Sequence, residues 1–86
     1  MTTFTYVIQD PLGIHARPAG QLAKTAATFA DCDIKVSANG QTADAKRIMG
    51  LMKLGAKQGH TLTITCESGD EAAAAAGMEA FLKENL

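Results

Sequence analysis

The chain has 86 residues, which is enough for one hydrophobic core, and we expect a single domain over residues 1–86. A formal net charge of −1, an aromatic content of 5% and the absence of Trp offer neither a basic surface nor stacking platforms for nucleic acid. No signal peptide is visible, and the longest apolar stretch, Ala72–Met78, is far shorter than a membrane span, so we expect a cytoplasmic protein with no membrane insertion.

The first third of the chain predicts a strand, a turn and a helix. Apolar and polar side chains alternate over Thr3–Gln9, which is the pattern of a half-buried strand. Asp10–Gly13 then supplies turn residues. The apolar positions that follow His15 recur at helical spacing, which predicts a helix from about Ala16 to Thr28.

The middle of the chain predicts a hairpin followed by a short helix. A second strand spans roughly Asp31–Ser37, and Asn39–Gly40 is a strong turn signal. The chain should return as a brief strand over Gln41–Ala43. A helix is expected near Lys46–Lys53, with Gly55 in a C-cap role.

The last part of the chain predicts one more strand and one more helix. Thr61–Glu67 alternates cleanly, so its threonines should face solvent. Ser68–Asp70 should cap the final helix, with Asp70 and Glu71 at its positive end. An apolar stripe follows at helical spacing: Ala74, Ala75, Met78, Phe81 and Leu82.

The predicted order of elements is βαββαβα. Strands that each expose one polar face favour an antiparallel sheet with the helices on its other face. The predicted fold class is therefore α/β (α+β), an open-faced two-layer β-sandwich. The pattern alone leaves the order of the strands in the sheet open.

The heptapeptide at residues 13–19, Gly-Ile-His-Ala-Arg-Pro-Ala, is the main candidate site. Pro18 suits the first turn of a helix, so His15 should lie at the helix start, near the free backbone N–H groups around Ala16. Arg17 adds a full positive charge. An imidazole, a helix N-terminus and a guanidinium together favour phosphate or phosphoryl. Because imidazole is a nucleophile, His15 could also carry the phosphoryl group covalently.

A plainer interpretation is that His15 merely caps the helix. Gly13 permits a tight turn before the histidine, and Pro18 fixes the helix start. Ala16 and Ala19 leave room for a partner to approach. These neighbours favour a phosphoryl site over a simple cap.

Gly13–Ala19 resembles the active-site signature of the HPr family, the histidine-containing phosphocarriers of the phosphoenolpyruvate:sugar phosphotransferase system. Lys46–Gly55 is similar to the family's second signature in nearly every position, and the resemblance covers essentially the whole chain. It implies a four-stranded antiparallel sheet covered on one face by three helices. It also implies that phospho-Enzyme I phosphorylates His15 on Nδ1, and that a sugar-specific IIA domain then accepts the phosphoryl group.

The short helix predicted near Lys46–Lys53 carries four apolar side chains in about two turns, so some of them should be exposed. Methionines suit a surface that must fit several partners. The sequence leaves open whether Ile48 and Leu51 instead cover one end of the core. The resemblance implies a partner surface that includes Arg17, Gly20, Lys24, Arg47, Ile48, Met49, Leu51 and Met52.

Arg47 departs from the family pattern. Many HPr proteins of Gram-positive-type systems carry a regulatory serine at this place, which a dedicated kinase phosphorylates. Arginine cannot accept that phosphate, so we expect no serine-based control by that route. The departure leaves open whether the chain serves a sugar, a nitrogen or a dihydroxyacetone branch.

We expect a monomeric phosphocarrier that is a substrate of its partners and not an enzyme, with no cofactor and no metal. One alternative is a regulatory docking module; the absence of the histidine would favour it, but His15 is present. Another is an enzyme that works through phosphohistidine. It would need a second histidine or a carboxylate in the same site, and no motif near His15 offers one.

The remaining reactive side chains have structural interpretations. Cys32 and Cys66 alternate with apolar residues, so both are predicted as thiols on the buried faces of strands. His60 has no partner motif and is predicted to be a solvated turn residue.

Overall fold

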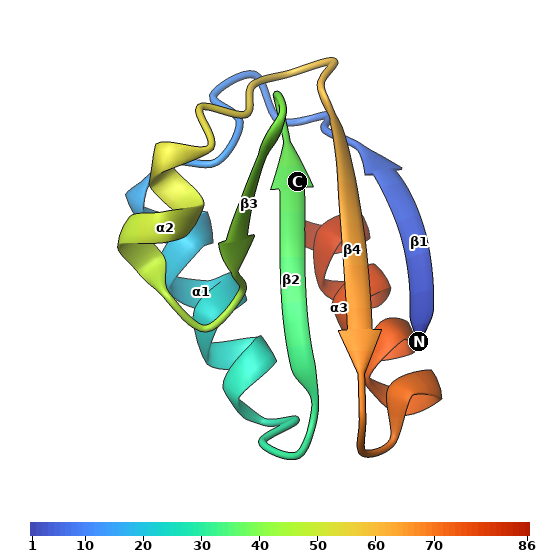
Figure 1. Ribbon diagram of the computed structural model, residues 1–86. Helices are drawn as coiled ribbons and strands as arrows, with labels where there is room; N and C mark the ends of the chain where they lie inside the picture. The colour runs from blue at the N-terminus through green and yellow to red at the C-terminus, as the bar shows by residue number, and fades with distance from the viewer.

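The computed structural model describes all 86 residues as a four-stranded sheet with three helices on one face (Figure 1). The strand order is β1-β4-β2-β3, and every neighbouring pair is antiparallel. The predicted fold class is therefore confirmed. The elements are β1 (Thr2–Val7), α1 (Ala16–Ala27), β2 (Asp33–Ala38), β3 (Gln41–Asp44), α2 (Ile48–Lys53), β4 (Thr61–Glu67) and α3 (Glu71–Asn85).

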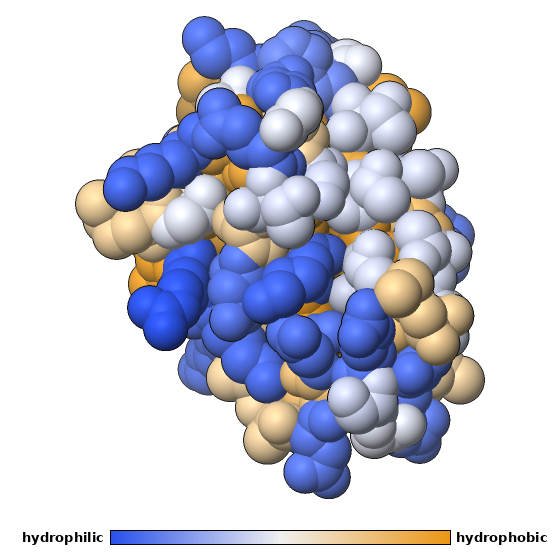
Figure 2. Space-filling model, in the orientation of Figure 1, coloured by the Kyte–Doolittle hydropathy of each residue, from blue (hydrophilic) through white to orange (hydrophobic).

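The last strand in sequence lies inside the sheet, between β1 and β2. Ile64 of β4 is opposite Phe4 on one side and Val36 on the other, so these apolar side chains share the helix-covered face. The other face is open. Figure 2 shows it mainly in hydrophilic and neutral colours, in keeping with the outward-facing threonines that the alternation predicted.

One hydrophobic core fills the space between the sheet and the helices. Alanines and Leu22 of α1, together with Met78 and Leu82 of α3, are buried against strand residues such as Ile34 and Ile64. Small alanine side chains let α1 lie close to the sheet, because closely packed interiors leave little room for larger groups. None of the helices is both long and apolar enough to cross a membrane.

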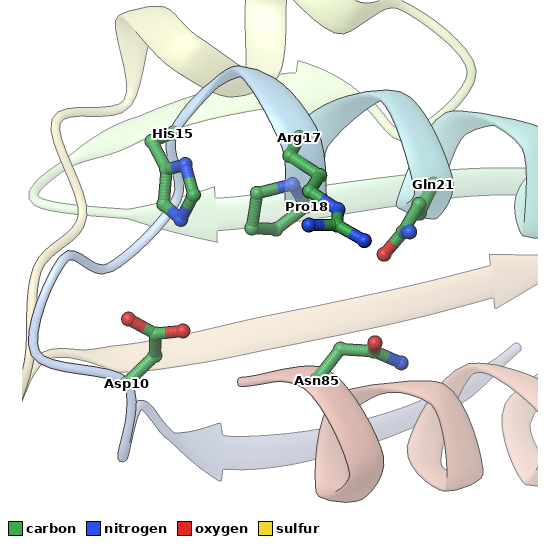
Figure 3. A pocket seen from close by; sticks show the side chains of 6 residues that line it. All are labelled: Asp10, His15, Arg17, Pro18, Gln21 and Asn85. Atoms are coloured by element: carbon green, nitrogen blue, oxygen red, sulfur yellow. The ribbon is translucent and has the colours of Figure 1, made fainter.

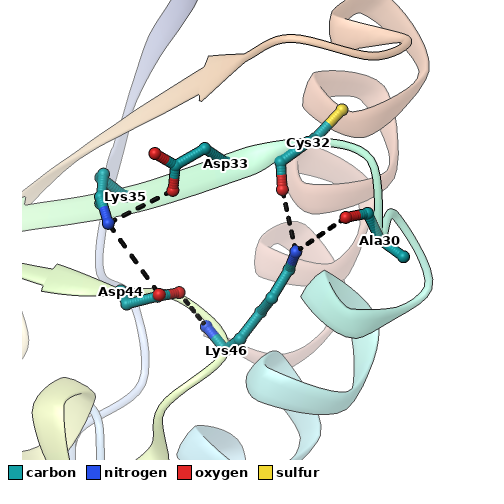
Figure 4. A network of polar contacts seen from close by, with 6 residues as sticks. All are labelled: Ala30, Cys32, Asp33, Lys35, Asp44 and Lys46. Atoms are coloured by element: carbon teal, nitrogen blue, oxygen red, sulfur yellow. Dashed lines mark hydrogen bonds and ion pairs between the residues drawn. The ribbon is translucent and has the colours of Figure 1, made fainter.

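The second helix begins later than predicted, at Ile48 instead of Lys46. The preceding residues form a turn in which Asp44 Oδ1 accepts the Lys46 N–H at 2.9 Å and the Asp44 carbonyl accepts the Arg47 N–H at 3.0 Å. The Lys46 ammonium also donates to the Cys32 carbonyl at 2.9 Å (Figure 4). These contacts fix the start of α2 against the beginning of β2.

The prediction for the cysteines is confirmed for burial and wrong for the placement of Cys32. The second strand begins at Asp33, so Cys32 precedes it, and the Cys32 thiol donates to the Ser68 carbonyl at 3.0 Å. Cys66 lies on β4, and burial raises the pKa of its thiol. Both thiols are buried and free.

Candidate functional site

A cavity of about 250 Å³ lies at the start of α1 (Figure 3). It draws on three parts of the chain that are distant in sequence: the loop after β1, the first turns of α1 and the end of α3. Its lining residues are Asp10, His15, Arg17, Pro18, Gln21 and Asn85. The predicted heptapeptide thus forms one wall of the cavity, and residues that the sequence analysis did not select form the other.

His15 is the N-cap residue of α1, as predicted. Its backbone is extended (φ −115°), and its carbonyl accepts the Ala19 N–H at 3.0 Å. Its side chain makes no capping hydrogen bond. The alternative in which the His15 imidazole merely caps the helix is therefore wrong, and the ring is left free for other chemistry.

The start of α1 carries unsatisfied donors beside the imidazole. The backbone N–H groups of Ala16 and Arg17 have no acceptor in the protein, and Pro18 has no N–H to satisfy. The first turn contains no acidic residue, so nothing offsets the positive end of the helix dipole. This arrangement suits an anion with several oxygens.

The loop that precedes His15 rests on the chain after α2. Gly13 adopts a left-handed conformation (φ 66°), and a Cβ there would overlap the Ala56 carbonyl oxygen and lie 2.5 Å from Lys57 Cα. The Ile14 N–H also donates to the Ala56 carbonyl at 3.0 Å. Only glycine fits this close approach, so Gly13 sets the position of His15 through packing as well as through its turn.

The opposite wall of the cavity was missed by the sequence analysis. Asp10 and Asn85 face His15 and Arg17 across it (Figure 3). The sequence analysis found no motif near His15 that offers a carboxylate, whereas the structure brings the Asp10 carboxylate into the same cavity. Asp10 had been interpreted only as a turn residue, and nothing in the local pattern indicates that the end of α3 meets this loop. The Asp10 N–H donates to the Leu86 carbonyl at 2.9 Å, which joins the two segments.

Several apolar residues of the expected partner surface form an exposed patch on α2. Met49, Met52 and Ile48 are 68%, 40% and 44% exposed. Leu51 is fully buried, so the prediction that it contacts a partner is wrong, because its side chain belongs to the core. A helix this short cannot expose every face while resting on a sheet edge.

The polar members of the expected surface lie around this patch. Arg17 and Lys24 are exposed on α1, and α1 packs beside α2, where Ile48 Cδ1 lies 4.0 Å from a Cβ built on Gly20. Arg47 is the exposed N-cap residue of α2 and makes no side-chain capping bond. Its guanidinium has only donors, so it offers no acceptor for the helix N–H groups.

His60 differs from its prediction. It is half-buried, and its Nδ1 accepts the Lys57 N–H at 3.0 Å. The ring therefore closes a turn and is not simply solvated. It does not line the cavity that contains His15.

Comparison with known proteins finds similarity to one family over nearly the whole chain. A family model described as "PTS HPr component phosphorylation site" matches residues 2–84. The phosphocarrier protein HPr of Mycoplasma genitalium is 40% identical over 85 residues, which is 99% of this chain and 97% of that protein.

Solved structures give the same result. The structure of a mycoplasma histidine-containing phosphocarrier protein has a TM-score of 0.91 at 32% identity, covering 96% of this chain and 93% of its own. An HPr dimer from Thermoanaerobacter tengcongensis has a TM-score of 0.75 at 33% identity, covering 98% and 95%.

Proposed function

The chain belongs to the HPr family of phosphotransferase-system phosphocarriers, and from this premise we propose that His15 accepts a phosphoryl group from phospho-Enzyme I and passes it to a IIA domain. The observation that carries the proposal is the uncapped His15 imidazole beside free helix N–H groups and Arg17 in one cavity. In this role the protein is a carrier and not an enzyme, and it works as a cytoplasmic monomer.

The transfer needs a neutral imidazole. The Nδ1 lone pair forms the bond to phosphorus while the bond from phosphorus to the donor breaks, and its electron pair stays on the donor. The Ala16 and Arg17 N–H groups and the Arg17 guanidinium then donate hydrogen bonds to the phosphoryl oxygens and stabilise their negative charge. This stabilisation must remain moderate, because a carrier that bound the group too tightly would not release it.

The test uses phosphoenolpyruvate and Enzyme I, with intact mass as the readout. The wild-type protein should gain one acid-labile phosphoryl group, and His15→Ala should gain none. His60→Ala is the matched control, because it removes the other histidine and should still be phosphorylated. A phosphorylated His15→Ala protein, or a wild type that gains nothing, would contradict the proposal.

The apolar patch of Ile48, Met49 and Met52 is proposed as the Enzyme I contact. Met49→Asp should weaken the complex by at least tenfold, because a charge would be buried without a partner. Ala80→Asp, a change at an exposed position on α3, is the control and should leave affinity unchanged. Calorimetric titration with Enzyme I measures both, and equal affinities for the two variants would remove α2 from the contact.

A further inference from the structure

The two ring nitrogens of His15 face different surroundings. In Figure 3, Nδ1 lies on the side of α1, whereas Nε2 points across the cavity toward the Asp10 carboxylate. No direct hydrogen bond joins Asp10 to His15. The open space of the cavity therefore separates the carboxylate from the ring.

Asp10 is held in this orientation by its own loop. Its Oδ1 accepts the Leu12 N–H at 2.8 Å, and it has no ion-pair partner. The charged groups that line the cavity with His15 are Asp10 and Arg17, since α3 contributes only the uncharged Asn85 and α1 adds Gln21. Among the side chains that line the cavity, Asp10 is thus the negatively charged one on the far side of the imidazole.

We propose that Asp10 is a positioning residue that keeps the proton of His15 on Nε2. This leaves the Nδ1 lone pair free to take the phosphoryl group and makes the resulting phosphohistidine a more reactive donor. The inference rests on the proposed carrier function. It adds a reason why Nδ1 is the reacting atom and a means of setting how readily the group moves on.

The physical basis is the interaction of a carboxylate with an N–H dipole and with a positive ring. A negative charge opposite Nε2 favours the tautomer with the proton there. After transfer, Nε2 is the basic atom that remains on the ring, and the same charge favours its protonation. A protonated ring is the better leaving group: the N–P bond breaks, its electron pair returns to Nδ1, and a neutral imidazole with its proton on Nε2 is regenerated.

Repulsion between the Asp10 carboxylate and the phosphoryl group also makes the phosphohistidine a more reactive donor. The phosphoryl oxygens are negative, so a carboxylate on the opposite wall makes the phosphorylated state less stable. Two unit charges on opposite walls of a partly solvated cavity change an equilibrium by roughly severalfold. Removing the charge of Asp10 should therefore lengthen the life of the phosphohistidine.

The experiment varies the charge of this wall in three steps. Asp10→Asn removes the negative charge while its amide oxygen can still accept the Leu12 N–H. The wild type carries one negative charge, and Asn85→Asp adds a second on the same wall. Asp31→Asn is the control, because Asp31 lines a separate cavity at the other end of α1.

Each protein is phosphorylated with phosphoramidate, so that docking on Enzyme I plays no part, and hydrolysis is followed by phosphorus NMR from pH 5 to 9. Asp10→Asn should have a phosphohistidine that lives about three to ten times longer near neutral pH. The midpoint of its pH–rate profile should move to lower pH. Asn85→Asp should change both quantities in the opposite direction, and Asp31→Asn should match the wild type.

The outcomes separate this inference from the carrier function. Equal lifetimes and pH profiles in the wild type, Asp10→Asn and Asn85→Asp would overturn the role of Asp10 while leaving His15 as the acceptor. A wild type that phosphoenolpyruvate and Enzyme I fail to phosphorylate would instead overturn the carrier function. A folding defect is recognised from the circular dichroism spectrum, and the Asn85→Asp series still decides the question if Asp10→Asn is defective.

Discussion

The two long helices begin in opposite ways. At the start of α3, the Asp70 side chain accepts the Ala73 N–H at 3.2 Å, and Glu71 accepts the Ser68 N–H at 2.9 Å. At the start of α1, the His15 side chain caps nothing, and no acidic residue lies in the first turn. One helix end is closed by the protein itself, and the other is left open.

The difference indicates that the start of α3 contributes to stability and that the start of α1 is available to bind an anion. A good N-cap contributes about 1 kcal/mol to the free energy of unfolding, so α1 gives up stability that α3 keeps. The open donors lie beside a free imidazole and a guanidinium, where an external anion can take the place of a cap. We therefore expect substitutions at the start of α1 to change phosphoryl transfer, and substitutions at the start of α3 to change stability.

The largest effect is expected at Arg17. Arg17→Ala removes the cation at the open helix end and should slow transfer from Enzyme I at least tenfold. The side chain is exposed, so the free energy of unfolding should change by less than about 0.5 kcal/mol. Rapid-quench kinetics and urea unfolding measure the two quantities, with Arg17→Lys as an intermediate control. An unchanged rate would mean that the helix N–H groups alone hold the phosphoryl oxygens.

A second change closes the open end. Ala16→Glu gives α1 the acidic first turn that Glu71 gives α3, and Ala16 is exposed, so the new side chain fits. The carboxylate should stabilise the protein by about 0.5 kcal/mol and slow transfer severalfold, because it repels the incoming phosphoryl group. Ala16→Gln has the same length without the charge and should do neither. An unchanged transfer rate in Ala16→Glu would show that the open end has no part in the reaction.

The sequence predicted the closed and the open helix ends because both are local. Asp70 and Glu71 are a capping pattern within a few residues, and His15–Pro18 is a helix start that can be identified in the same way. The predicted bounds of strand β4 match the structure for the same reason, since strict alternation of polar and apolar residues marks both of its ends. These helix and strand ends follow from residues that are close together in the sequence, so they can be predicted before the fold is known.

The sequence did not predict what depends on contacts between distant segments. Asp10 and Asn85 meet only because β1 pairs with β4 and α3 returns behind the sheet. The burial of Leu51 follows from how α2 rests on α1 and β3, and helical periodicity in six residues cannot fix that orientation. The strand order had to remain open for the same physical reason.

Substitutions at the closed start of α3 should change the free energy of unfolding and leave phosphoryl transfer unchanged. Asp70→Ala removes the acceptor for the Ala73 N–H and should lower the free energy of unfolding by about 1 kcal/mol. Asp70 lines the cavity at the far end of α1 from His15, so transfer should be unchanged. Urea unfolding and the phosphorylation rate measure the two effects, and Asp70→Ser, which keeps an acceptor, should lose less. Slower transfer in Asp70→Ala would break the separation between the two helix ends.

The smallest effect is expected from Glu71, through pH. A hydrogen bond to the Met1 amino group, 2.9 Å from Glu71 Oε1, lowers the pKa of Glu71 from 4.5, and the same bond raises the pKa of that amino group from 8.0. The lowered pKa adds stability that is present above about pH 4.5 and is lost in acid as Glu71 is protonated. The raised pKa adds stability that is present below about pH 8 and is lost as the amino group deprotonates.

Glu71→Gln should therefore lower the melting temperature most between about pH 5 and 7.5, and the difference from the wild type should shrink on both sides. Thermal unfolding from pH 3 to 10 measures it, on protein shown by intact mass to retain Met1. Glu84→Gln, an exposed change with no ion pair, is the control and should follow the wild-type curve. A difference that shrinks in acid but stays constant above pH 7.5 would mean that Glu71 stabilises α3 only through the Ser68 N–H and the helix dipole, and that the contact with Met1 contributes nothing.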